Sequence, residues 1–141
     1  MLRIVKPGLL TALLIGASVG ASAQGLDIGQ REYMNSCAQC HGAAGKGDGV
    51  IAGFLTQRLP DLSTLQSENG GVFPFARLYE VISGTATVGV HGTSEMPAWG
   101  NRYNAQARVQ LGEMYSPSDQ QAFVRGRILA LIEYVSTLQA Q

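Results

Sequence analysis

The stretch CAQCH at residues 37–41 is followed at once by GAAGKGDG at residues 42–49. Two cysteines three positions apart are typical of three kinds of site: a redox-active dithiol, half of a zinc site, or the attachment point of a haem. A disulfide between Cys37 and Cys40 would close a very short loop and add little loop-closure entropy, so a purely structural bridge is a poor use of the pair. The rest of the sequence has to decide among the three.

The residues around the two cysteines favour haem attachment. Two thiols add across the vinyl groups of a haem, the two spacer residues let one helical turn present both sulfurs, and His41 follows in position to coordinate the iron. A thioredoxin-like dithiol normally follows a strand in an α/β pattern, which is not visible here. A zinc site needs four ligands, and only the distant His91 would complete it. The glycine-rich stretch is not a phosphate-binding loop, since Cys40 stands where that motif has its first glycine. We therefore expect one covalent haem c with its iron.

The first 23 residues have the three parts of a secretory signal peptide. Arg3 and Lys6 give a basic start, residues 9–19 are apolar apart from small residues, and residues 21–23 read ASA, a small-residue cleavage signature. The rival interpretation is an uncleaved membrane anchor, but the apolar run is shorter than the roughly 20 residues that span a bilayer. We expect residues 1–23 to be removed and the protein to be exported to the periplasm, with a membrane contact only if the segment is left uncleaved.

The remaining segment, residues 24–141, is a single domain's length and slightly acidic. It holds eight Lys and Arg against ten Asp and Glu, a net charge of −2. This charge argues against nucleic acid as a partner, because nothing here neutralises a run of phosphates. Its 118 residues allow a modest hydrophobic core, which a cofactor would help to fill. We expect a monohaem cytochrome c domain over this segment.

The periodicity of the domain predicts an all-α fold with long loops. Apolar residues at three- and four-residue steps, together with helix start and stop signals, predict helices over residues 27–36, 73–83, 104–115 and 116–138. Residues 42–60 and 84–101 are rich in glycine and are expected to be loops. Such loops need something to pack against, and a flat apolar macrocycle would serve. We expect three to five helices wrapped round one haem.

The last helix has the clearest signals. Ser116 is a suitable N-cap, Pro117 suits the first helical position, and Asp119 complements the positive helix start. An apolar stripe at alternating three- and four-residue steps then marks a face turned to the core. The stripe consists of Val124, Ile128, Leu131, Val135 and Leu138.

The second axial position on the iron has five candidate side chains. These are Met34, Lys46, His91, Met96 and Met114. Met34 precedes the cysteines on the same predicted helix and cannot easily reach the far face of the haem. Met114 falls at the end of a predicted helix, where we expect it in the core.

Met96 is the favoured second ligand beside His41. It lies in the loop sequence HGTSEMPAWG, with Pro97 after it to stiffen the backbone and Trp99 close by to cover an apolar face. Two alternatives stay open: Met96 serves packing alone, or His91 is the ligand in a bis-histidine site. A thioether favours ferrous iron, so histidine–methionine ligation predicts a higher reduction potential than two histidines.

Together these segments resemble the class I c-type cytochromes, small exported electron carriers with one haem. The resemblance covers residues 27–138 and rests on CAQCHG, GKGDG, MPAWG and the C-terminal sequence ILALIEYVSTL. It implies a cytochrome c-like fold in which an N-terminal helix crosses the C-terminal helix through a glycine and an aromatic residue. In this chain the implied crossing residues are Gly29 and Tyr33, and their implied partners are Leu131 and Tyr134.

The resemblance also implies residues of the haem pocket. Pro60, in LPDL, would offer its carbonyl to His41 and so orient the imidazole. Trp99 is expected to cover the haem. Residues 101–116 depart from the compact family pattern, and this segment is a candidate to shield a haem edge, to supply Arg102 to a propionate or to form a docking surface. We expect its arginines to be solvated.

A haem with both axial positions filled leaves no open site for a substrate, so the implied chemistry is outer-sphere one-electron transfer without catalytic residues. We expect a periplasmic carrier, free or as the cytochrome subunit of a dehydrogenase, that passes electrons towards a respiratory oxidase or other terminal acceptor. The alternative is a haem enzyme or gas sensor with an open or displaceable sixth position. A structural metal-binding module is a third possibility.

Overall fold

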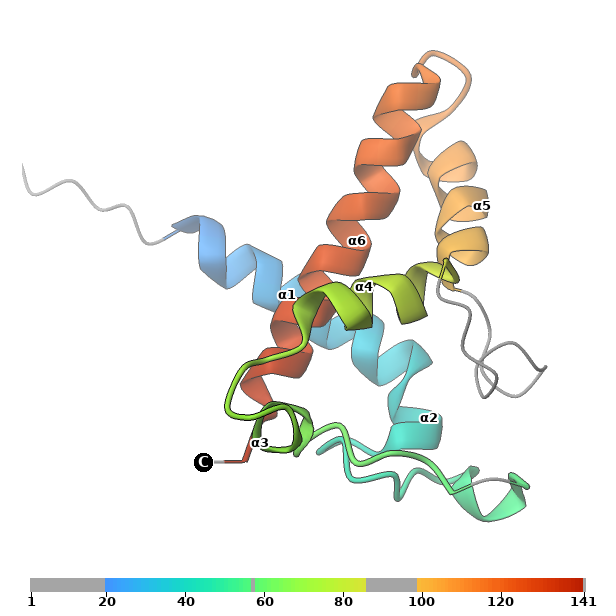
Figure 1. Ribbon diagram of the computed structural model, residues 1–141. Helices are drawn as coiled ribbons and strands as arrows, with labels where there is room; N and C mark the ends of the chain where they lie inside the picture. The colour runs from blue at the N-terminus through green and yellow to red at the C-terminus, as the bar shows by residue number, and fades with distance from the viewer. Residues whose placement is uncertain (1–19, 57, 86–98, 141) are drawn as a thin grey trace, which may run out of the picture.

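The computed structural model describes residues 20–56, 58–85 and 99–140, and the backbone alone for residues 20–25 (Figure 1). The elements are α1 (Gly20–Ser36), α2 (Ala38–His41), the 3-10 helix η1 (Ala52–Phe54), α3 (Leu65–Glu68), α4 (Phe75–Ser83), α5 (Trp99–Leu111) and α6 (Pro117–Thr137). No strand occurs in the described ranges, so the expected all-α class is confirmed. Four of these helices, α1, α4, α5 and α6, are longer than four residues, which agrees with the expected three to five.

Helix α6 is the centre of the fold, and α1, α4 and α5 all pack against it (Figure 1). Its predicted apolar stripe is buried at Ile128, Leu131 and Val135. Ile132 is buried as well, because α6 is covered on more than one side. Burying a side chain of this size contributes roughly 1.5–3 kcal/mol relative to leaving it exposed, so α6 supplies much of the core's stability.

The crossing of α1 and α6 depends on a glycine, as the family resemblance implies. A Cβ atom built on Gly29 would overlap the carbonyl oxygen of Ala130 and would lie 3.0 Å from the Cβ of Tyr134. The rings of Tyr33 and Tyr134 are in contact, with centroids 5.2 Å apart. The expected crossing is therefore confirmed for Gly29, Tyr33 and Tyr134, and Ala130 is a further partner that the sequence did not indicate.

The start of α6 is capped as predicted. The Ser116 hydroxyl accepts a hydrogen bond from the Asp119 backbone N–H at 3.3 Å, and the Asp119 carboxylate accepts one from the Ser116 N–H at 2.9 Å. These two bonds form a capping box, which satisfies donors that the first turn leaves unpaired. The Ser116 hydroxyl and N–H, as donors to the carboxylate, also lower the pKa of Asp119. Stability from this cap is present above the ordinary pKa of an aspartate and is lost as the pH falls through the lowered pKa.

Helix α5 lies further towards the N-terminus than the predicted helix over residues 104–115. It begins at Trp99 and ends at Leu111, where Gly112 follows with φ 78°. The prediction of a loop up to residue 101 was therefore wrong at its end. The physical reason is that Trp99, Tyr103 and Ala107, which are four residues apart, are all buried. Residues four apart lie on one face of a helix, so a helix that begins at Trp99 turns all three towards the core.

The segment over residues 101–116 is thus only partly a solvated insertion. Tyr103 and Ala107 are fully buried, while Arg102 and Arg108 are exposed, as expected of the arginines. The expectation that Met114 is in the core is wrong, because its side chain is 95% exposed beyond the end of the helix.

The shorter elements agree with the sequence in outline. Helix α4 begins two residues later than predicted, after Pro74 at its N-cap, and ends at the expected Gly84 with φ 82°. The one-turn helix α3 was not predicted. Within the described residues, none of the helices combines the length and apolar character that crossing a membrane requires.

Candidate haem site

The two cysteines and the histidine lie on one capped helical turn at the end of α1. Cys37 is the N-cap of α2 and is tied back to α1 by a hydrogen bond from its N–H to the Tyr33 carbonyl, at 2.8 Å. Its own carbonyl accepts hydrogen bonds from the N–H groups of Cys40 at 3.1 Å and His41 at 2.8 Å. One turn therefore presents both thiols and the imidazole, as attachment of a haem requires.

The glycine-rich loop over residues 42–49, together with Ile51, satisfies the carbonyls of this turn. A four-residue helix has no following turn to accept from, so its last carbonyls need other donors. Backbone N–H groups of the loop provide them. The bonds run from Gly47 to His41 (2.8 Å), from Gly49 to Cys40 (3.0 Å) and from Ile51 to Gln39 (3.0 Å). The loop thus holds the turn that carries His41.

Glycine is required in this loop for two reasons. Gly47 has φ 74°, in the left-handed region that side chains rarely adopt. Gly49 approaches α2 so closely that a Cβ atom would overlap the Gln39 carbonyl oxygen and lie 2.6 Å from the Cys40 carbonyl carbon. The sequence excluded a phosphate-binding loop here and indicated no other role for these glycines. Their role is to let the loop backbone pack closely against the attachment turn.

Tyr33 connects α1 to the residue after His41. Its side chain is fully buried, and its hydroxyl donates a hydrogen bond to the Gly42 carbonyl at 2.7 Å. Burial, followed by the nearby Cys37, raises the pKa of Tyr33, so the hydroxyl stays a donor. The sequence indicated Tyr33 only as an aromatic residue of the helix crossing. A tyrosine rather than a phenylalanine four residues before the first cysteine is the signal that could have indicated this bond.

The segment that carries Pro60 is held beside the glycine-rich loop. The Leu62 N–H donates to the Gly45 carbonyl at 2.6 Å. The Asp61 carboxylate accepts hydrogen bonds from the hydroxyl and N–H of Ser63, which lower its pKa. Pro60 itself is exposed. Its bond to His41 stays a prediction.

The surroundings of the two thiols do not favour a redox dithiol or a metal cluster. Cys37 and Cys40 are half-buried free thiols, and burial, followed by the neighbouring Cys40, raises the pKa of Cys37 to about 12. A redox dithiol needs a lowered pKa instead. The described residues also contain no group of three His, Cys, Asp or Glu side chains that could hold a metal ion.

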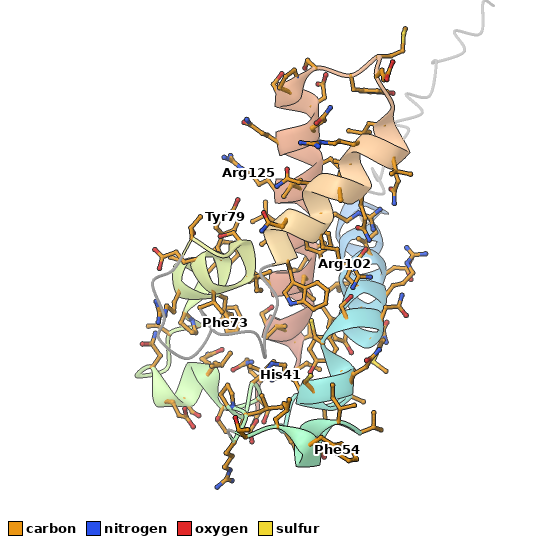
Figure 2. The ribbon with its side chains drawn as sticks, turned by 90° about the vertical axis from the view of Figure 1, so that its right-hand side faces the viewer. His41, Phe54, Phe73, Tyr79, Arg102 and Arg125 are labelled. Atoms are coloured by element: carbon orange, nitrogen blue, oxygen red, sulfur yellow. The ribbon has the colours of Figure 1, made fainter. Side chains whose placement is uncertain are left out.

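The side chains around His41 suit an apolar macrocycle. His41 is only 6% exposed and lies on the inner side of α2, towards the part of the molecule that carries Phe73 (Figure 2). Phe73, Leu78 and Tyr79 are partly buried and pack against the core from that part. Two thiols and one imidazole on one turn, with partly buried apolar side chains in the part of the molecule that His41 faces, fit a covalently bound haem.

The predicted pocket residues on α5 lie close together. Trp99 is 7% exposed within the core, and the Arg102 guanidinium lies 5.0 Å from the centre of its ring, a cation–π contact. The positive charge of Arg102 also acts on the Cys37 thiol, lowering its pKa against the larger effect of burial. A bond from Arg102 to a propionate stays a prediction.

The second axial position has candidates both outside and inside the described residues. Met96, Pro97 and His91 lie outside the described residues. Of the other candidates, Lys46 is exposed, and Met34 is 44% exposed on α1. Met96 therefore stays the prediction for this position.

Comparison with known families supports the same kind of protein. The family described as "Cytochrome C oxidase, cbb3-type, subunit III" matches residues 24–113, more than half of the chain. No curated protein and no solved structure matches the chain. The matched residues run from within helix α1 to just after helix α5. They include the CAQCH turn and the glycine-rich loop. The chain therefore belongs to this cytochrome c family, whose cofactor is haem c and whose chemistry is electron transfer.

Proposed function

We propose that this chain is a periplasmic one-electron carrier whose single haem is attached at Cys37 and Cys40 and held by His41 and Met96. The observation that carries the proposal is the capped turn at the end of α1, where two free thiols and a buried imidazole lie within five residues. Bound at this turn, haem c supplies an iron that takes up and releases one electron.

The surrounding chain supports electron transfer rather than catalysis on a substrate. Backbone donors from the glycine-rich loop and the Tyr33 hydroxyl hold the turn from two directions. A ligand fixed in this way keeps nearly the same position in both oxidation states, so little reorganisation opposes the electron's transfer. With Met96 on the opposite side, no position remains for a substrate.

Export to the periplasm is supported by the sequence at the N-terminus. The family match begins at residue 24, directly after the ASA signature at residues 21–23. We propose residues 1–23 as the cleaved signal peptide and residues 24–141 as the haem domain.

The partners we propose are a dehydrogenase as donor and a respiratory oxidase or other terminal acceptor, with the chain either free or a subunit of the dehydrogenase. An exposed apolar surface adjoins the attachment turn: Val50 is 83% and Phe54 87% exposed, and Ile51 is hydrogen-bonded to Gln39, between the two cysteines (Figure 2). Residues 49–56 carry no charge. This surface suits a redox partner that meets the haem domain with an apolar face.

The test has two parts on separate samples of the exported protein: acid–acetone extraction, and the absorption spectrum of the native protein during a redox titration. We expect the haem to stay with the protein and to titrate as one one-electron couple. Replacing both Cys37 and Cys40 by serine is the control and is expected to release the haem. A colourless chain from a host with working haem-attachment machinery would overturn the proposal.

The second axial ligand has its own test. Met96→Ala is expected to abolish the long-wavelength absorption band of ferric iron bound to a thioether and to lower the reduction potential, because a ligand that favours ferrous iron is lost. Met34→Ala and Met114→Ala, at exposed methionines, are the controls and should leave both unchanged. A band that persists in Met96→Ala would exclude Met96, and a wild-type protein that lacks the band and binds carbon monoxide would indicate an open-site enzyme or sensor.

A further inference from the structure

One side chain ties the end of helix α6 to the segment that carries Pro60, residues 59–66, which we term the Pro60 segment. Nε2 of Gln139 donates a hydrogen bond to the Leu62 carbonyl at 2.7 Å, and Oε1 accepts one from the Gln66 N–H at 2.9 Å. Gln66 belongs to α3, which lies beside the end of α6 (Figure 1). The two bonded residues are 77 and 73 positions earlier in the chain, so both bonds depend on the fold.

Gln139 is held in this position from α6 itself. Its Nε2 also donates to the Val135 carbonyl at 3.0 Å, one helical turn earlier, and the bonds to Val135 and Leu62 are both part-buried. The next residue adds a backbone bond in the same direction, from the Ala140 N–H to the Ser63 carbonyl at 2.8 Å. Because water competes less with part-buried hydrogen bonds than with exposed ones, the segment is firmly joined to the end of α6.

The Pro60 segment in turn meets the glycine-rich loop at two places. The Leu62 N–H donates to the Gly45 carbonyl at 2.6 Å, so Leu62 is bonded to α6 through its carbonyl and to the loop through its N–H. At Gly47, a Cβ atom would lie 3.1 Å from the Leu59 carbonyl oxygen and 3.5 Å from the Leu59 Cβ. The Pro60 segment therefore lies directly against the glycine-rich loop.

Gly47 joins the loop to the attachment turn, because its N–H donates to the His41 carbonyl at 2.8 Å. Hydrogen bonds and close backbone contacts thus run from Gln139 through Leu62 and the glycine-rich loop to His41. On the side of α1, the Tyr33 hydroxyl holds the residue directly after His41. The turn is therefore supported from both helices of the crossing, by Tyr33 from α1 and by Gln139 from the end of α6.

We propose that Gln139 is a positioning residue for the haem site, which holds the Pro60 segment against the glycine-rich loop and so holds the turn that carries His41. When its bonds to Leu62 and Gln66 are lost, the segment moves away from the loop more often, and the loop supports the His41 backbone less. The imidazole is then less well fixed as an iron ligand. Gln139 acts through Leu62 and Gly47 and is not itself a ligand. The inference rests on the proposed function, because it concerns the ligand of an attached haem.

Amide hydrogen exchange in the reduced, haem-loaded protein, followed by NMR, tests this positioning. Gln139→Met keeps the length of the side chain and removes its polar atoms. We expect exchange at the Leu62 and Gly47 N–H groups to become about tenfold faster, which corresponds to about 1.4 kcal/mol, within the range for the loss of two ordinary hydrogen bonds. In the oxidised protein, the NMR signals of the His41 ring should shift, because they depend on how the imidazole is oriented at the iron.

Gln139→Glu separates the two bonds of the side chain. At neutral pH it keeps an acceptor for the Gln66 N–H but offers no donor to the Leu62 carbonyl. It should therefore accelerate exchange at the Leu62 N–H and leave the Gln66 N–H protected. The same variant is the test if Gln139→Met does not fold.

Ser116→Ala is the matched control, because it removes a side-chain hydrogen bond at the other end of the same helix and with it a comparable part of the stability. It should leave exchange at Leu62 and Gly47, and the signals of the His41 ring, unchanged. If Gln139→Met leaves the exchange or the ring signals unchanged, or if both variants change them equally, the inference is overturned and the proposed function stands. A wild-type protein without haem would overturn the proposed function itself.

Discussion

Gly29→Ala is expected to lower the free energy of unfolding by about 3 kcal/mol, the upper end of the usual range for overpacking a core. The added Cβ would overlap the Ala130 carbonyl oxygen and would crowd the Tyr134 Cβ at 3.0 Å. These are backbone and Cβ atoms of a helix, which cannot rotate away as the end of a long side chain can. The two helices must therefore move apart at their closest point.

Guanidinium unfolding of the haem-loaded protein, followed by circular dichroism, measures this effect. Gly126→Ala is the matched control on α6, because no atom lies within 4 Å of the Cβ that it adds. Alanine has the higher helix propensity, so this variant should gain about 0.8–1.0 kcal/mol. Equal changes in the two variants would show that the crossing tolerates a side chain and would contradict the packing described above.

The crossing also matters for the haem site, because Tyr33 belongs to both. Its ring packs on Tyr134 of α6, and its hydroxyl holds the Gly42 carbonyl directly after His41. A displacement of α1 against α6 is therefore transmitted to the attachment turn through one side chain. The helix pair is the support of the site as well as the centre of the core.

The parts of the fold that the sequence predicted are those with local signals. The cap at Ser116 depends on residues within one helical turn, and so does the CAQCH turn. The crossing at Gly29 was accessible through the family resemblance, because a glycine and an aromatic residue at fixed distances before the first cysteine form a local pattern. In each case the chemistry that sets the structure lies within a few residues of the chain.

The start of α5 lacked such a signal. The helix begins at Trp99 without a Ser, Thr, Asp or Asn directly before it, and its first buried residues lie in what the sequence presented as a glycine-rich loop. Its position is set by packing instead: Gly100 approaches the Ser83 carbonyl of α4 too closely for a side chain, and Tyr103 enters the core. Contacts of this kind join segments that are distant in the sequence, so no local start signal marks them.

The ion pair between Glu32 of α1 and Arg127 of α6, with 2.7 Å between Oε1 and Nη1, was inaccessible to the sequence for the same reason. Glu32 and Arg127 are 95 residues apart, and each occurs among residues that suit an exposed helix face. Only the packing of the helices brings the two side chains together and partly shields them from water. The sequence therefore presents two ordinary polar residues, and the fold makes a part-buried ion pair of them.

Arg127→Met is expected to lower the free energy of unfolding by about 3 kcal/mol, since it leaves the Glu32 carboxylate in the interior without its counter-charge. The side chain of Glu32 is only 13% exposed, so water replaces the guanidinium poorly. Arg31→Met is the matched control. It breaks the exposed pair of Arg31 with Asp27, both on α1, and should lower the free energy of unfolding by less than about 1 kcal/mol.

The double variant Glu32→Gln with Arg127→Met separates the buried charge from the lost packing. It removes the carboxylate's charge as well as the arginine, so most of the loss should be recovered, because an apolar or neutral replacement of a buried ion pair is often neutral in stability. The contact of Arg127 with Phe123 is lost in both variants and therefore cancels in the comparison. Guanidinium unfolding of the two variants and the wild type gives the measurement. A double variant as unstable as Arg127→Met alone would show that the two side chains are not coupled.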